Sequence, residues 1–104
     1  PSCMRVVFAE RARQDIEAIY DYIASSNPTA AQAVEDAIRT TCEALAEFPY
    51  AAPATDEPDV RRAPLVIYPY TIFYRVDDQR QRIEVARVIH GARITDLRRL
   101  PEDP

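Results

Sequence analysis

Apolar residues recur with two different periods along the chain, and the change of period divides it into two halves. Between residues 12 and 48 they recur every three or four positions, which is the spacing of amphipathic helices. Between residues 60 and 90 they fall in short runs rich in β-branched and aromatic residues, which is typical of strands. The pattern predicts a helical first half and a β second half, with one further short strand at residues 4–9.

Two helices joined by a short turn are expected in the first half. The first helix carries its apolar face at Ala12, Ile16, Ile19, Tyr20 and Ile23. The second carries its apolar face at Ala31, Val34, Ile38, Cys42 and Leu45. Asn27 suits the N-cap of the second helix and Pro28 its first position, while Pro49 disfavours helical geometry just before it. So short a turn predicts an antiparallel helix hairpin.

Three strands are expected in the second half, at residues 60–68, 70–76 and 83–90. Pro64 confines the first to an edge or a bulge, because proline donates no ladder hydrogen bond. In the second strand, even-numbered residues face one side and odd-numbered residues the other. In the third strand, strict alternation places His90 on one face with Glu84, Ala86 and Val88. The turn at 77–82 contains no glycine, so we expect more than two residues in it.

The expected element order is β-α-α-β-β-β-α, with Thr95 or Asp96 capping a short last helix that closes at Pro101. Consecutive strands with short connections predict an antiparallel sheet, which the first strand joins and the helix hairpin covers on one face. This is a two-layer α+β fold. The 104 residues suffice for one domain, which we place at residues 4–104. We expect residues 1–3, which precede Met4, to be a remnant of expression.

The composition excludes several kinds of chemistry. A single glycine rules out a phosphate-binding loop, and a single histidine with two scattered cysteines provides no metal site. The three serines lie at the terminus and at a helix end, where no nucleophile is activated. We therefore expect no metal, no cofactor and no catalytic triad. Cys42, on an apolar helix face, is expected to be a buried thiol.

Charge and hydropathy restrict the partners. The net charge of −4 counts against bulk binding of DNA or RNA, although it is compatible with a local basic patch. No apolar run approaches the roughly 20 residues that span a membrane, and no signal peptide is visible. The low cysteine content fits a cytoplasmic protein.

The basic residues, all of them arginine, provide the one constellation left. Arginines on neighbouring strands, Arg75 and Arg87 above all, would form a cationic surface for phosphates or for carboxylates of a partner. The alternative, which we favour, is that they pair with acidic residues on a solvated sheet face. From the residues alone, an interaction module is favoured over an enzyme.

The adjacent His90 and Gly91 have two interpretations as well. Gly91 is expected where the last strand turns, with a positive φ or a crowded backbone. A titrating base at His90 is one interpretation. The favoured one is structural, with His90 hydrogen-bonding the terminal segment against the sheet.

Several segments, in order from Met4 to Leu100, resemble the RelE/ParE toxin superfamily of bacterial type II toxin–antitoxin systems, often named plasmid stabilisation proteins. They are VVFAERARQDIEAIYDYIA at the first strand and helix, NP and FP around the second helix, YTIFYRVD, and RVIHGAR at the end of the last strand. The last of these is the most specific. The resemblance implies the same two-layer fold.

The superfamily implies two activities, cleavage of messenger RNA on the ribosome by RelE-like members and inhibition of DNA gyrase by ParE-like members. Arg93 matches the arginine after the shared glycine, but the position of the RelE-like tyrosine holds Arg99, and the paired lysines are absent. The resemblance therefore favours the ParE-like branch, a gyrase inhibitor that is not an enzyme. The first alternative is a ribonuclease using Arg62, Arg75, His90 and Arg93. The second is a non-toxic interaction module of the same fold.

The resemblance also implies partners. A cognate antitoxin, of the ribbon-helix-helix type, would wrap the chain and bind operator DNA, so that this chain meets DNA only indirectly. Its expected contacts are Ile19, Tyr20, Ile23 and Tyr74, with the alternative that all four fill the chain's own core. The expected gyrase contacts are Arg93, Arg98 and Arg99. A homodimer is left open.

Overall fold

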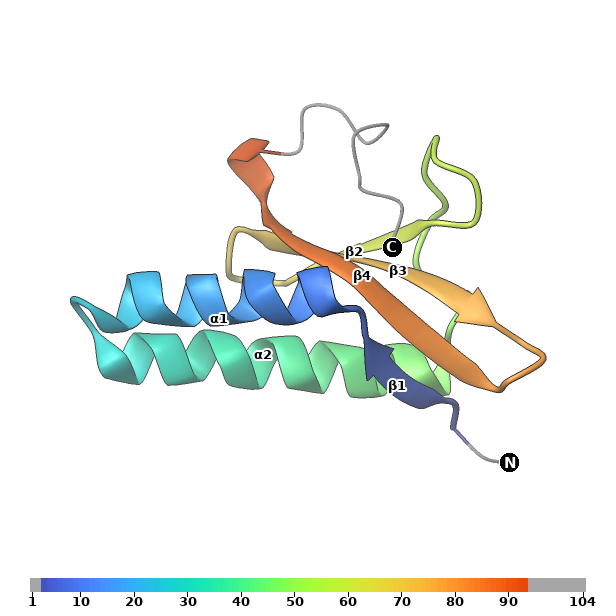
Figure 1. Ribbon diagram of the computed structural model, residues 1–104, viewed down its shortest axis with the longest axis horizontal. Helices are drawn as coiled ribbons and strands as arrows, with labels where there is room; N and C mark the ends of the chain where they lie inside the picture. Colours follow the sequence, from blue (N-terminus) through green and yellow to red (C-terminus); the bar gives the residue numbers. More distant parts are fainter. Residues whose placement is uncertain (1–2, 94–104) are drawn as a thin grey trace.

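Two antiparallel helices pack on one face of a four-stranded sheet (Figure 1). The structure is a computed structural model, and it describes residues 3–93. The elements are β1 (Arg5–Phe8), α1 (Glu10–Ala24), α2 (Pro28–Glu47), β2 (Arg61–Pro64), β3 (Tyr70–Asp77), β4 (Arg82–His90) and a 3-10 turn at Gly91–Arg93. The predicted α+β fold is confirmed. The helix predicted before Pro101 lies outside the described residues.

The sheet is mixed, which corrects the prediction of an antiparallel one. Its strand order is β1-β4-β3-β2, and β2, β3 and β4 form the expected antiparallel meander. β1 instead runs parallel to β4, from the pair Arg5 and Arg82 to the pair Phe8 and Val85. The sequence of β1 does not indicate whether the strand runs parallel or antiparallel to its partner, because that partner is the strand farthest from it in sequence.

The two helices are built as expected, with different degrees of burial. The Asn27 side chain caps α2 by accepting a hydrogen bond from the Ala30 N–H at 3.0 Å. All five residues of the predicted apolar face of α2 are buried, and burial raises the pKa of the Cys42 thiol to about 12. On α1 only Ala12 is buried. The sides of α1 therefore remain open to solvent.

β2 is shorter than the predicted strand at 60–68, because the chain turns immediately after Pro64. The Leu65 N–H donates to the Tyr70 carbonyl at 2.9 Å and closes a four-residue tip. Val66 and Ile67 on this tip are 97% and 76% exposed. The edge position predicted for Pro64 is confirmed, since β2 is the outer strand.

A β-bulge in β4 corrects the predicted alternation. Tyr74 pairs with Val85 but Phe73 pairs with Arg87, so Ala86 is an extra residue on β4. The extra residue reverses the faces beyond it, because side chains alternate with a period of two. His90 consequently shares the helix-covered face with Val88, and Glu84 lies on the opposite face.

Candidate functional site

His90 lies at the end of β4, in a groove between this strand and α1. Its ring packs edge-to-face on Tyr70, with ring centroids 5.3 Å apart. Its Nδ1 accepts a hydrogen bond from the Ala92 N–H at 3.0 Å, so the proton of the neutral ring is on Nε2. The favoured structural role of His90 thus has a geometric basis. The groove, of about 600 Å³, is lined by Asp15, Ala18, Ile19, Tyr22, Tyr70, Ala92 and residues 87–90.

Gly91, the next residue, has neither the positive φ nor the crowded backbone that was predicted for it. Its φ is not positive, and an added Cβ would lie 3.6 Å from the Pro69 carbonyl oxygen, an ordinary van der Waals contact. The Gly91 N–H donates to that oxygen at 2.6 Å, which fixes the start of the 3-10 turn against the tip after β2. The chain does turn here, but the prediction of a positive φ or a crowded backbone was wrong.

Asp15 of α1 holds this end of β4 through three hydrogen bonds. The Arg87 guanidinium donates to both Asp15 carboxylate oxygens, at 2.7 and 3.0 Å, and the Val88 N–H donates at 3.0 Å. β1 ends opposite Val85, so Val88 has no partner strand on that side. Both charged side chains are mostly buried, with 13% of Asp15 and 17% of Arg87 exposed. Arg87 does pair with an acidic residue, but that residue is a mostly buried carboxylate of α1 and does not lie on the solvated sheet face that we favoured.

Sequence reasoning missed this clasp between Asp15 and Arg87. The two residues are 72 positions apart, and Asp15 looks like any residue of a solvated helix face. The signal that was present is the shortness of β1, which leaves about half of β4 without a strand on its β1 side.

The candidate ribonuclease residues are not brought together. Arg62 lies opposite Phe73 and Arg75 opposite Glu84, on the face that points away from the helices. His90 lies opposite Tyr70 on the helix-covered face. The backbone of Arg93 belongs to the 3-10 turn, and its side chain lies outside the description.

Tyr74, expected at the antitoxin surface, instead belongs to the core. It has no exposed surface, and its hydroxyl donates to the Pro49 carbonyl oxygen at 2.7 Å. Burial raises the pKa of this hydroxyl. A fully buried side chain offers nothing to a partner, so the alternative that it fills the chain's own core is the correct one for this residue.

The other three antitoxin candidates lie on α1. Ile19 and Ile23 are half-buried and pack on the core. Ile19 lines the His90 groove, whereas Tyr20 lines a second groove of about 540 Å³ with Phe8, Ile16 and the charged residues Arg13, Glu17, Asp21 and Glu35. The candidates therefore divide between two grooves along α1. Arg98 and Arg99, the expected target contacts, lie outside the described residues.

Two searches of residues 3–93 bear on other kinds of site. They hold no cluster of three or more side chains suited to a metal ion. None of their helices is long and apolar enough to cross a membrane.

Two solved structures share the fold of this chain. The chromosomal ParDE system of P. aeruginosa matches with a TM-score of 0.73 at 24% identity, over 85% of this chain and 96% of that one. An E. coli RelE mutant in the free state matches with a TM-score of 0.63 at 19% identity, over 90% and 88%. At these identities, the two matches show that the chain shares the fold of these proteins.

Sequence comparisons identify the family. The family model of the ParE toxin of type II toxin–antitoxin systems matches residues 6–95. A curated relative, Toxin RelE2 of Caulobacter vibrioides, is 37% identical over 93 residues, covering 86% of this chain and 98% of the relative. The chain belongs to the ParE toxin family of type II toxin–antitoxin systems.

Proposed function

We propose that this toxin inhibits DNA gyrase by protein–protein contact and has no ribonuclease activity. The observation that carries the proposal is the separation of the ribonuclease candidates by the sheet. Cleavage of RNA requires a base at the 2′-hydroxyl and cations at the same phosphate. Here His90 is on one face, and Arg62 and Arg75 are on the other.

The state of His90 supports the same proposal. A general base needs a ring nitrogen that is free to accept a proton. Nδ1 already accepts the Ala92 N–H, and Nε2 carries the ring proton. Base catalysis by His90 would first require this hydrogen bond to break.

We further propose that a cognate antitoxin of the ribbon-helix-helix type neutralises the toxin by covering α1. Two grooves, of about 540 and 600 Å³, run along this helix, and each has apolar side chains within it. One solved structure similar to this chain, at 23% identity and a TM-score of 0.59, is the RelBE2 toxin–antitoxin complex of Mycobacterium tuberculosis. Tyr22, 78% exposed beside the His90 groove, is a large apolar side chain of α1 that such a partner would cover.

Induction of the chain in cells without antitoxin tests the proposal. We expect growth arrest with linearised plasmid DNA and intact transcripts, and recovery when the adjacent reading frame is expressed too. Cleaved transcripts with intact DNA would support the ribonuclease alternative instead. Unimpeded growth would support the non-toxic module.

A further inference from the structure

Charge is distributed unevenly between the two layers of the fold. α1 and α2 contain eight acidic and three basic residues, a net charge of −5. The four strands and the turn between β3 and β4 contain seven arginines and three acidic residues, a net charge of +4. The fold therefore makes the sheet layer positive although the whole chain is negative.

Three of these arginines gather where β1, β4 and the β3–β4 turn meet; we call Arg5, Arg80 and Arg82 the arginine corner. Arg5 and Arg82 are direct partners in the parallel pairing of β1 with β4, so their side chains start from the same face. Like charges placed opposite each other on neighbouring strands destabilise a sheet. An external anion would relieve this repulsion.

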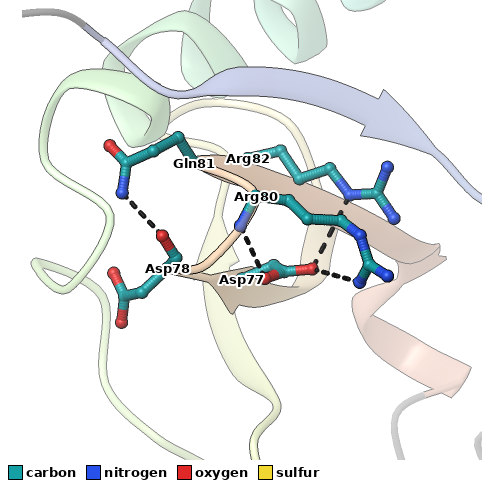
Figure 2. Close-up of polar contacts among 5 residues, drawn as sticks. All are labelled: Asp77, Asp78, Arg80, Gln81 and Arg82. Carbon is teal, nitrogen blue, oxygen red and sulfur yellow. Dashed lines mark hydrogen bonds and ion pairs between the residues drawn. The ribbon is translucent and has the colours of Figure 1, made fainter.

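Among the described residues, Asp77 provides the one carboxylate that forms ion pairs with arginines of the corner. Asp77 Oδ2 lies 3.1 Å from Arg80 Nη1 and 3.8 Å from Arg82 Nε (Figure 2). The carboxylate of the neighbouring Asp78 points away from both guanidinium groups (Figure 2). It accepts a hydrogen bond from the Tyr50 hydroxyl. Arg5 forms no ion pair with any residue in the described part of the chain. Two guanidinium groups thus share one carboxylate, and the third, that of Arg5, has no ion-pair partner among the described residues.

The corner is open to a large ligand. The Arg80 side chain is 66% exposed and that of Arg82 is 32% exposed. The acidic residues of the loop before β2 precede the opposite edge strand of the sheet, because β1 and β2 are its two outer strands. The arginine corner therefore favours the binding of an anion. Guanidinium groups bind phosphate oxygens in a bidentate geometry.

We propose that the arginine corner contacts the phosphate backbone of duplex DNA. The inference rests on the proposed function, because gyrase presents duplex DNA beside the toxin. Recognition of single-stranded RNA relies on exposed aromatic side chains that stack on bases. The one aromatic strand residue on the face away from the helices, Phe73, is completely buried. Contact with a duplex backbone requires cations alone.

Fluorescence anisotropy with the full chain and a labelled duplex of arbitrary sequence tests the corner. The test variant is the double substitution Arg5→Gln and Arg80→Gln, and the matched control is Arg11→Gln with Arg39→Gln on the helices. Both remove two positive charges from exposed side chains. At about 50 mM salt we expect the test variant to lose about tenfold in affinity, and its slope of log affinity against log salt to fall by about 2. The control stays within about twofold of the wild type, and thermal melting verifies that both are folded.

Three outcomes would overturn the inference: equal loss in both variants, no salt-dependent binding of the duplex by the wild type, or tighter binding of a single-stranded RNA of equal length. A parallel gyrase supercoiling reaction separates the two proposals. If gyrase is inhibited but the corner has no role in DNA binding, the inference is overturned and the proposed function stands. DNA binding through the corner without gyrase inhibition supports the inference and contradicts the proposed function.

Discussion

The two ends of β4 use arginine in opposite ways. At the end beside α1, Arg87 is largely buried and joined to Asp15 by two hydrogen bonds. At the other end, Arg82 lies opposite Arg5 and shares Asp77 with the exposed Arg80. The residue type and the strand are the same, so the difference comes from what lies beside the strand.

This difference follows from the length of β1. β1 covers β4 as far as Val85, which leaves the Val88 N–H to the side chain of Asp15. Where a helix with a carboxylate replaces the missing strand, the arginine is neutralised and becomes structural. Where β1 itself is the neighbour, it adds a second arginine and the charge accumulates. We infer that one end serves stability and the other recognition.

Substitution of Asp15 should have the largest effect on stability. Asp15→Ala leaves the Arg87 charge and the Val88 N–H without their partner, and we expect a loss of about 2–3 kcal/mol in the free energy of unfolding. Urea denaturation measures this loss, and the melting temperature should fall by roughly 10–20 °C. Asp21→Ala, on the exposed side of the same helix, is the control and should stay close to wild type. If the two variants are equally stable, the clasp has no structural role.

His90→Gln tests the same end of β4 with a smaller effect. It removes the edge-to-face contact with Tyr70, so we expect a loss of about 1 kcal/mol in unfolding free energy. Gyrase inhibition should remain within about threefold of wild type, whereas removal of a general base lowers a rate by 10²–10⁴-fold. Arg93→Ala should weaken inhibition more than His90→Gln does. Complete loss of activity in a folded His90→Gln protein would contradict a purely structural role of His90.

The turn at the other end of β4 should tolerate change and even gain stability. Gln81 has a φ of 51°, in the left-handed region that glycine adopts without strain. We expect Gln81→Gly to raise the free energy of unfolding by about 0.5 kcal/mol, because it relieves this strain. Gln79→Gly, in the same turn but without a positive φ, should lower it. Chemical denaturation of both variants checks the opposite signs, and a loss in both would exclude backbone strain at Gln81.

Asp77 at the arginine corner should give the smallest effect, visible mainly as a pH dependence. Hydrogen bonds from Arg80, the backbone N–H first and the side chain second, lower the pKa of Asp77 from its ordinary 3.8. The stabilisation is therefore complete above the unfolded pKa of about 3.9 and is lost as the pH falls through the lower folded pKa. The difference in urea midpoint between wild type and Asp77→Asn should be full at neutral pH and shrink below about pH 4. A difference that stays constant down to about pH 2 would contradict this assignment.

Local patterns predicted most of the elements. Asn27 with Pro28 marked the start of α2, because side-chain capping and a missing N–H act within one turn of helix. The alternation in β3 also placed its residues on the correct faces, because a strand has a fixed period of two. Such signals lie within a few residues of what they determine.

The features that position the candidate site are not local. The pairs of Asp15 with Arg87 and of Arg5 with Arg82 join distant parts of the chain, and both depend on which part of β4 pairs with β1. The extra residue Ala86 reversed the face of His90 without any mark in the sequence, since no glycine or proline accompanies the bulge. The alternation left the burial of Tyr74 as one of two alternatives, because a half-exposed and a central strand show similar alternation.

The central claim is that this toxin acts on gyrase without chemistry of its own, and a purified supercoiling reaction tests it most directly. Plasmid DNA, gyrase and ATP are incubated with the wild-type chain, and cleaved DNA is measured after the protein is digested. We predict accumulation of linear DNA that requires gyrase and persists with His90→Gln. Normally supercoiled, intact DNA, together with cleavage of messenger RNA by the same preparation on translating ribosomes, would contradict the claim.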